Sequence, residues 1–402
     1  MTSDIESAID DLQRSGRLRD ARLYAFGHTA ATEQIRRQLG RNDITLTGIL
    51  DNNPVKQGSS LHGVPVIPPR AITDVNVPSV VLIASRFHSE MRQQLVDLGY
   101  AGEIIRVGTL SIGTDAASGS DTLRGARLLD QLRAAHPDRH LVVCPFAALG
   151  DVYWALAYLP AFAAAGRWLR PAVVVVVGQG CRQVAWLFGH EDVHSLSQPE
   201  MDDLVGAVVD GGAQDATIAH HDRPYGDGAP VRALEHRFVA FTDMYRDLVY
   251  TLSPQTAQHA PKRDVLRQAG QANPSWASEI PRGRAVLMAP YAKSVVPVPW
   301  SFWEHIAERH VSQGDVVATV VHGDEDPVPG TLALEIPIPE LLDAVEHAGT
   351  FISLRSGLCD VVHTARARKV HVFPDAHYST TPYKVADFFA LPGWESVVLQ
   401  VS

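Results

Sequence analysis

Cysteine is scarce in this sequence. The 402 residues include only three, Cys144, Cys181 and Cys359, and these lie far apart. An odd number of widely separated cysteines excludes a disulfide framework, and there is no Cys-x-x-Cys pair to hold a metal ion. A reducing compartment suits this usage, so we expect a cytoplasmic protein without a structural metal.

Long apolar runs and surplus positive charge are also missing. The most apolar stretch, PAVVVVVG at residues 171–178, is far too short to cross a bilayer. The first 20 residues are polar and acidic, unlike a signal peptide. With 35 Lys and Arg against 45 Asp and Glu, the formal net charge is −10. We therefore expect no stable membrane insertion and no binding of nucleic acid.

The chain does contain strand-like and helix-like stretches that alternate along three consecutive regions. Hydrophobic residues make up 46% and charged residues 20%, an ordinary globular composition. Alternation of this kind predicts parallel sheets covered by helices. We expect an α/β protein of three Rossmann-like domains: an N-terminal accessory domain at 1–110, a Gly/Ser/Thr-rich linker at 111–125, and two further domains at 126–280 and 281–402.

The first domain carries a weak dinucleotide signal. FGHTAATE follows its first strand, and Asp51 lies 24 residues after Gly27, but the other glycines of the dinucleotide fingerprint are absent. The stretch GILDNNPVKQGSSLHGVPVIPP resembles the Rossmann-like domain that accompanies sugar acyltransferases. That resemblance implies a sugar-nucleotide context. The alternative is a docking or oligomerisation module, through which the chain could form a homo-oligomer.

Two other motifs favour a structural interpretation. GQGCRQ at 178–183 contains Gly-x-Gly, which turn geometry explains. HEDVH at 190–194 has the letters of a zinc-protease motif, which requires both histidines on one face of a helix. Gly189 ends the preceding helix and leaves too few residues for another, so we expect a solvated loop. We expect a polar loop at His220-His221 as well.

Gly150-Asp151 marks the first strand–helix junction with chemical interest. Asp151 lies near the start of the helix that follows HLVVCPF. It either caps that helix or acts as a general base at the carboxyl edge of a parallel sheet, where ligands bind. The stretch PFAALGDVYWALAYLPAF resembles the opening of heptosyltransferase-type glycosyltransferases. The resemblance implies that Asp151 is the catalytic base and that Gly150 lies on the acceptor side.

The last domain continues this resemblance. LMAPYAKSVVPVPWSFWEHIAE, ATVVHGDED and SLRSGLCDVVHTARARKVHVFP are similar to the family's donor-binding segments, in the family's order. The resemblance implies a GT-B fold, in which the last two domains face each other. It places donor-binding roles on Lys293, Ser294, His322, Arg355, Ser356, Gly357, Leu358 and Asp360. The family's last loop reads closer to D-(S/T)-G-x-x-H, and this departure leaves the identity of the sugar open.

A diphosphate would suit that last junction physically. Backbone N–H groups of Ser356, Gly357 and Leu358 could cradle it at the positive end of a helix. Arg355 or Lys293 could neutralise the departing diphosphate in place of a metal ion. Asp360 would bond the ribose or cap the helix.

These features together predict a glycosyltransferase without cofactor or metal. It would move a sugar, which the family resemblance implies is a hexose or heptose, from a nucleoside diphosphate-sugar to a glycan or small-molecule hydroxyl. Inversion at the anomeric carbon is implied by the resemblance alone.

Two alternatives remain open at this point. The tail, ISLRSG followed by KVHVFPDAHYSTTPYKVADFF, resembles polysaccharide pyruvyltransferases, whose donor is phosphoenolpyruvate. Arg355 and Lys384 would then grip phosphate and carboxylate. The other alternative is a non-catalytic scaffold that binds a sugar nucleotide or a partner protein.

Overall fold

The computed structural model describes residues 4–19, 21–27, 30–52, 56–72, 78–84, 88–107, 119–165, 170–210, 213–221, 229–253, 266, 274–292, 295, 298–378 and 381–400. The chain forms two compact units. The first consists of Met1–Thr122 with Asp222–His236 and Ser379–Thr381, and the second of Leu123–His221, Arg237–Tyr378 and Pro382–Ser402.

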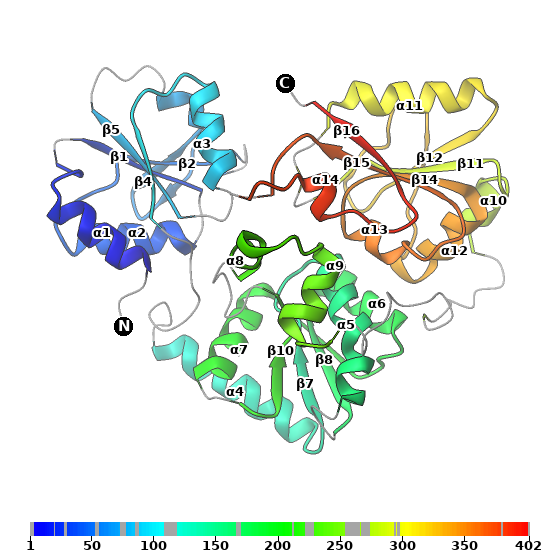
Figure 1. The fold of residues 1–402 in the computed structure, drawn as a ribbon, viewed down its shortest axis with the longest axis horizontal. Coiled ribbons are helices and arrows are strands. Elements are labelled where there is room, and N and C mark those ends of the chain that lie inside the picture. Colours follow the sequence, from blue (N-terminus) through cyan, green and yellow to red (C-terminus); the bar gives the residue numbers. More distant parts are fainter. Residues whose placement is uncertain are drawn as a thin grey trace. The chain divides into compact units, whose positions relative to one another are not determined.

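The first unit contains a six-stranded sheet with helices packed against it (Figure 1). Its strands are β1 (Arg22–Phe26), β2 (Gly48–Leu50), β3 (Ser60–Leu61), β4 (Val64–Ile67), β5 (Ser79–Ile83) and β6 (Glu103–Arg106), in the order β3-β4-β2-β1-β5-β6. All neighbours are parallel except β3 and β4. The helices are α1 (Asp4–Arg14), α2 (Ala30–Gly40), the 3₁₀ turn η1 (Pro69–Ile72) and α3 (His88–Asp97).

The core of this unit follows from the sequence pattern. The residues of β1 after Arg22 and all of β5 are buried, as expected of central strands in a parallel sheet that is covered on both faces. Ile9 of α1 and Ile35 of α2 pack with Leu23 and Ala25 in one hydrophobic cluster. The predicted Rossmann-like fold is therefore confirmed for this domain.

The second unit begins with a four-stranded parallel sheet. Its elements are α4 (Gly119–Ala135), β7 (His140–Val143), α5 (Leu149–Ala164), β8 (Ala172–Val177), α6 (Gly178–Leu187), β9 (Val193–Leu196), α7 (Gln198–Asp210) and β10 (Ala216–Ile218). The order is β10-β7-β8-β9. From β7 the chain therefore winds outward through β8 and β9, then returns to the other side of β7. The switch point lies between β7 and β10.

The boundary before this sheet differs from the predicted linker at 111–125. Residues 108–118 lie outside the described part of the chain, and from Gly119 onward the backbone is helix α4. Leu129 and Leu132 of α4 are buried in the hydrophobic cluster of this sheet. Burial of that apolar face stabilises the helix, although its first residues have the composition of a linker.

Short helices and a second parallel sheet complete the unit. The helices α8 (Ala229–His236, which groups with the first unit) and α9 (Phe241–Met244) and the π-helical turn η2 (Tyr245–Val249) precede α10 (Trp276–Glu279). Then come β11 (Ala285–Ala289), α11 (Trp300–Ser312), β12 (Val316–Val320), β13 (Leu332–Leu334), α12 (Ile338–Ala348), β14 (Gly349–Leu354), α13 (Gly357–Val361), β15 (Arg368–Pro374), α14 (Val385–Phe388) and β16 (Glu395–Leu399).

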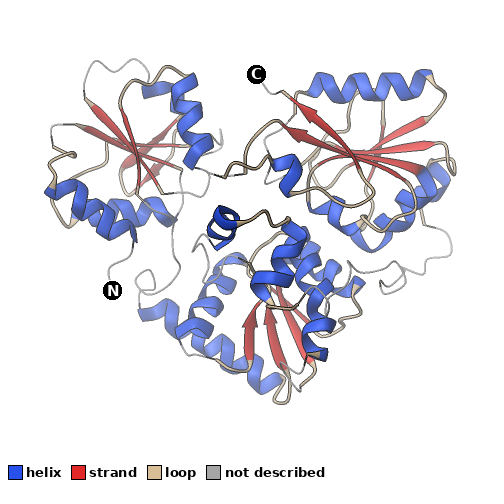
Figure 2. Cartoon of the chain, in the orientation of Figure 1, coloured by secondary structure: helices blue, strands red, loops and turns tan. Residues whose placement is uncertain are grey.

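The order of this sheet, β13-β12-β11-β14-β15-β16, places its switch point between β11 and β14. Figure 2 shows helices on both faces of the sheet. Gly150 follows β7 and Gly357 follows β14, and the two glycines are in contact. The carboxyl edges of the two sheets therefore face each other, so the predicted α/β fold with two facing Rossmann-like halves is confirmed.

Two further expectations can be compared with the structure. All three cysteines are free and buried, in agreement with the absence of a disulfide framework. Among the helices of the described residues, none is both long enough and apolar enough to cross a membrane.

Candidate functional site

Asp151 lies in the first turn of α5, directly after the loop that leaves β7. Ala148 occupies the N-cap of this helix and makes no side-chain cap, so the interpretation of Asp151 as a capping residue is wrong. The carboxylate is 23% exposed and points toward side chains that follow the neighbouring strand β10. It therefore lies at the switch point of the first sheet, where open α/β sheets bind their ligands.

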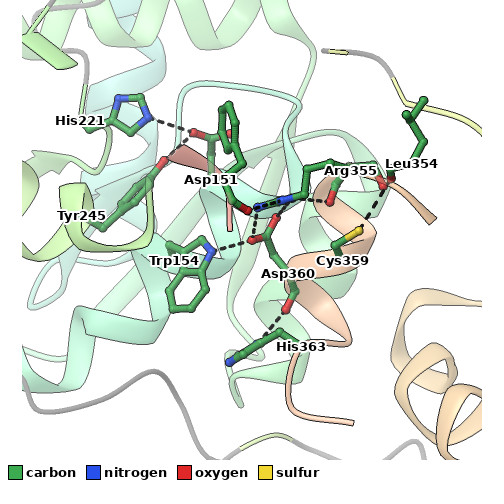
Figure 3. Close-up of polar contacts among 11 residues, drawn as sticks. Asp151, Trp154, His221, Tyr245, Leu354, Arg355, Cys359, Asp360 and His363 are labelled. Carbon is green, nitrogen blue, oxygen red and sulfur yellow. Dashed lines mark hydrogen bonds and ion pairs between the residues drawn. The ribbon is translucent and has the colours of Figure 1, made fainter. Parts of the chain in front are cut away.

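Three polar side chains surround one oxygen of this carboxylate. Tyr245 donates its hydroxyl to Asp151 Oδ1 over 2.6 Å, and His220 Nε2 lies 3.2 Å from the same atom. His221 Nε2 lies 3.6 Å from it. Figure 3 shows Asp151 between His221 and Tyr245. Among the described residues, no side chain or backbone donor bonds to Oδ2, so the protein holds one carboxylate oxygen through these contacts and not the other.

The surroundings keep this carboxylate ionised. Burial alone would raise the pKa of Asp151, but the hydrogen bond from His220, the charges of His220 and His221, and the hydrogen bond from Tyr245 together lower it. Burial and the adjacent Asp151 charge raise the pKa of Tyr245 well above its usual value, so its hydroxyl stays protonated and donates. The cluster thus presents a negatively charged oxygen of fixed orientation.

The two histidines differ from the sequence-based expectation. A polar loop was predicted at His220-His221, whereas their side chains are 3% and 6% exposed. The His220 ring packs edge-on against Phe146, and the His221 ring packs against Tyr245 and Phe241. The two residues do lie in a loop, directly after β10, but the expectation of a polar, exposed loop was wrong because it assessed them by local polarity. Only the pairing of β10 with β7 brings them to Asp151.

This cluster is also the one place, among the described residues, where at least three metal-binding side chains converge. The ligand atoms of Asp151, His220 and His221 all lie within 4.8 Å of one another. The zinc-protease letters HEDVH do not contribute, because His194 lies in strand β9 and not on a helix. The expectation of a loop there is wrong for Val193–Leu196.

A second buried polar cluster lies where α13 meets α5. Asp360 accepts two hydrogen bonds from the Arg355 guanidinium, both 2.8 Å long, and one of 2.8 Å from Trp154 Nε1. The side chains of Asp360 and Arg355 are 1% and 4% exposed. Arg355 also donates to the backbone carbonyls of Ser356 and Phe389. Figure 3 shows Asp360 between Trp154 and Arg355.

These contacts change the interpretation of both residues. Burial lowers the pKa of Arg355, but the charge of Asp360 more than compensates and raises it, so the guanidinium stays charged inside the protein. Its hydrogen bonds go to the protein, and no exposed N–H face is left for a diphosphate. Arg355 and Asp360 thus join α5 to α13, and Asp360 does not cap the helix; donor-binding roles for the two residues stay a prediction.

Gly150 and Gly357 allow this close packing. A Cβ on Gly150 would overlap Asp360 Oδ2, and a Cβ on Gly357 would lie 2.7 Å from the Gly150 nitrogen. Real Cβ atoms do not approach other atoms as closely as either of these contacts requires. The glycines of the two junctions are thus required by the contact between the halves, whatever ligand binds there.

The remaining residues predicted to bind the donor are not part of either buried cluster. Lys293 and Ser294 lie outside the described residues. His322 follows β12 at the carboxyl edge of the second sheet and is 90% exposed, 3.8 Å from Glu335. Ser356 buries its Oγ without a hydrogen-bond partner among the described residues. Lys384, invoked for a phosphoenolpyruvate donor, forms an ion pair of 2.8 Å with Asp375.

Comparisons with known proteins identify structural similarity only. Neither a protein-family model nor a curated protein sequence matches the chain significantly. The bacterial iron-containing dodecameric glycosyltransferase TibC of enterotoxigenic E. coli is similar at 16% identity and a TM-score of 0.40, over 61% of this chain. The chain spans 62% of TibC.

Two further solved structures are similar over larger shares of their own lengths. The ADP-heptose lipopolysaccharide heptosyltransferase II of E. coli matches at 13% identity, over 65% of this chain and 91% of that one, with a TM-score of 0.42. A family 9 glycosyltransferase of Veillonella parvula matches at 13% identity, over 66% and 86%, with a TM-score of 0.40. These proteins belong to the group that the two junction motifs resemble. Since every TM-score is below 0.5, the function has to be argued from the residues of the site.

Proposed function

We propose that the chain is a glycosyltransferase that moves a sugar from a nucleoside diphosphate-sugar to a hydroxyl group of a glycan or small molecule. The observation that carries this proposal is the Asp151 carboxylate, which Tyr245 and His220 hold through Oδ1 and which no described residue bonds through Oδ2. It lies at the switch point of one sheet and beside the carboxyl edge of the other. A fixed carboxylate in that position suits the activation of an acceptor hydroxyl.

The reaction follows from this geometry. Asp151 Oδ2 takes the proton of the acceptor hydroxyl while the acceptor oxygen forms a bond to the anomeric carbon. The bond between that carbon and the diphosphate oxygen breaks, and the nucleoside diphosphate leaves with the bonding electrons. A single displacement of this kind inverts the anomeric centre. Tyr245 and His220 hold the carboxylate in position and do not touch the substrate.

The donor would bind at the switch point of the second sheet, between the ends of β11 and β14. Backbone N–H groups of Ser356, Gly357 and Leu358, together with Lys293, Ser294 and His322, are the groups proposed to contact it. With Arg355 committed to Asp360, the charge on the departing diphosphate falls to Lys293 and the backbone amides. In this scheme the diphosphate needs no metal ion and the reaction no cofactor.

The alternative donors have less support. A phosphoenolpyruvate site would need Arg355 and Lys384, which are paired with Asp360 and Asp375. A non-catalytic scaffold would have no need for a carboxylate held through one oxygen and not the other. Self-association through the first unit remains a prediction.

A ligand screen followed by a turnover assay tests the proposal. Thermal unfolding of the full chain with UDP-, GDP-, TDP-, ADP- and CDP-sugars should show stabilisation by one nucleotide class, and phosphoenolpyruvate should have no effect. With the stabilising donor, Asp151→Asn should lower the transfer rate by about 10²–10⁴-fold and leave donor binding unchanged. EDTA should not reduce the wild-type rate.

Asp202→Asn is a matched control. Asp202 lies in helix α7 of the same half and accepts a hydrogen bond of 2.9 Å from Gln198, and it is not part of the Asp151 cluster. It should keep the wild-type rate. Stabilisation by phosphoenolpyruvate alone would replace the proposal with the pyruvyltransferase alternative, and no stabilisation by any donor would overturn it.

A further inference from the structure

We propose that Asp151, His220 and His221 also form a binding site for a divalent transition-metal ion of the Zn²⁺ class, and that the bound ion inhibits the reaction. The binding is independent of the proposed function, and only the inhibition rests on it.

The distances between the three side chains fit such an ion. Zn²⁺ binds imidazole nitrogen at about 2.0–2.1 Å and carboxylate oxygen at about 2.0–2.2 Å, so two ligands of a tetrahedral site lie about 3.3 Å apart. His220 Nε2 and His221 Nε2 lie 3.2 Å and 3.6 Å from Asp151 Oδ1. All three ligand atoms are within 4.8 Å of one another, so only small side-chain movements are needed to place an ion between them.

Three groups converge on one oxygen of the Asp151 carboxylate. Asp151 Oδ1 offers two lone-pair directions, and Tyr245 at 2.6 Å and His220 at 3.2 Å already approach it. His221 Nε2 faces the same oxygen at 3.6 Å, too far for a hydrogen bond. A cation between the rings and the carboxylate would use the lone pairs of all three groups at once.

The chemistry of the donor set selects the class of ion. Two imidazole nitrogens and one carboxylate oxygen suit Zn²⁺ and neighbouring transition metals, whereas Mg²⁺ and Ca²⁺ prefer sets made of oxygen atoms. Tyr245 orients the carboxylate by its hydrogen bond, as outer-shell partners of metal ligands do. The two histidines are almost fully buried, which limits the loss of side-chain entropy on binding.

Binding of the ion would inhibit because it uses the same carboxylate. A metal bound to Asp151 lowers the basicity of the oxygen that is proposed to take the acceptor proton. The ion therefore acts as a reversible inhibitor, and its removal by a chelator restores the base.

Metal binding to the full chain, after removal of any affinity tag, tests the site directly. Titration with ZnCl₂ in competition with a chromophoric chelator should show that one Zn²⁺ ion binds tightly per chain. Co²⁺ bound in its place should give the visible absorption of a tetrahedral site. His221→Ala and Asp151→Asn should each weaken Zn²⁺ binding at least tenfold. Tyr245→Phe, which keeps all three ligands, should weaken it about 10–100-fold.

The control is another histidine pair in the same half. His136 Nε2 and His194 Nε2 lie 2.7 Å apart, but among the described residues they belong to no group of three ligands. His194→Ala should therefore leave the tight Zn²⁺ equivalent unchanged. Circular dichroism of each variant separates loss of the site from loss of the fold.

Either of two results overturns the proposal: a wild-type chain that binds no tight equivalent, or an affinity that is the same in the wild type, His221→Ala and Asp151→Asn. The inhibition is tested in a separate assay of sugar transfer, in which ZnCl₂ should lower the transfer rate and EDTA should restore it. If the chain transfers no sugar, the proposed function fails, while the binding data still decide the metal site.

Discussion

Replacing Asp360 by Asn removes the negative charge from the buried cluster that joins α5 to α13. Arg355 would then remain charged at 4% exposure, without its only carboxylate partner among the described residues. Loss of one partner of a buried ion pair costs about 3–5 kcal/mol. Arg355 keeps its bonds to the carbonyls of Ser356 and Phe389, and the amide oxygen of Asn can still accept one bond. We therefore expect the low end, about 3 kcal/mol of unfolding free energy.

Tryptophan fluorescence during urea denaturation measures this change selectively. All seven tryptophans of the chain lie in the second unit, so their emission does not report the unfolding of the first. Trp154 itself donates to Asp360 and reports the junction directly. Because the chain has several domains, the comparison should use the transition that this signal follows.

An exposed ion pair in the same sheet provides the control. Arg368 and Glu395 also form a bidentate pair, but their side chains are 53% and 58% exposed. Glu395→Gln should cost about 0–1 kcal/mol. If Asp360→Asn costs no more than Glu395→Gln, the guanidinium of Arg355 is solvated, and the original assignment of Arg355 to an anionic ligand would be restored.

Further substitutions test the close packing at Gly357, the protonation of the buried His371 and the anchoring of Asp151 by Tyr245. Gly357→Ala should destabilise the second unit by about 1–3 kcal/mol in urea denaturation, because its Cβ would lie 2.7 Å from the Gly150 nitrogen. The control is Gly206→Ala, which lies in helix α7 with no atom within 4 Å of the added Cβ, and which should leave the unfolding free energy unchanged or raise it slightly in the same assay. Burial, reinforced by the charge of Arg355, lowers the pKa of His371 from 6.5 to about 4. Between pH 6.5 and about 4 the unfolded chain therefore binds a proton at His371 that the folded chain does not bind. Between pH 7 and pH 5 the unfolding free energy of the wild type should fall by about 2 kcal/mol more than that of His371→Gln. An equal pH dependence of the unfolding free energy in the two proteins would contradict this. Tyr245→Phe should lower kcat about tenfold or more with little change in the donor KM, because the carboxylate loses its anchor; a change confined to KM would place Tyr245 in donor binding instead.

The assignment of Arg355 shows where sequence reasoning reached its limit. A strand followed by Arg-Ser-Gly and a helix has the composition of an anion-binding junction. Nothing in the local sequence indicates that Asp360, five residues later, turns back to pair with the arginine. An i, i+5 pair that crosses a strand–helix turn depends on the backbone path. Its burial depends on Trp154, which is more than 200 residues away in the chain.

At the Asp151 cluster, too, the sequence predicted one residue and missed its partners. The strand–helix pattern placed Asp151 at the carboxyl edge of a parallel sheet, because that edge follows from local periodicity, and the resemblance to heptosyltransferases selected it as the candidate base. Tyr245 was not predicted, and His220-His221 was expected to be a polar loop. Their roles depend on β10 pairing with β7 across an interval that contains two other strands.

The sequence by itself determined the α/β fold class and its three successive strand–helix regions, because alternating apolar periods fix helices and parallel strands locally. It also located the two strand–helix junctions at Gly150-Asp151 and Ser356-Gly357, because each follows an apolar strand and precedes a helix. Only the tertiary structure decided which charges are paired within the protein and which oxygen of Asp151 the protein holds. Hydrogen bonds and ion pairs between distant segments depend on angstrom-scale distances, and such distances are set by the packing of the whole unit.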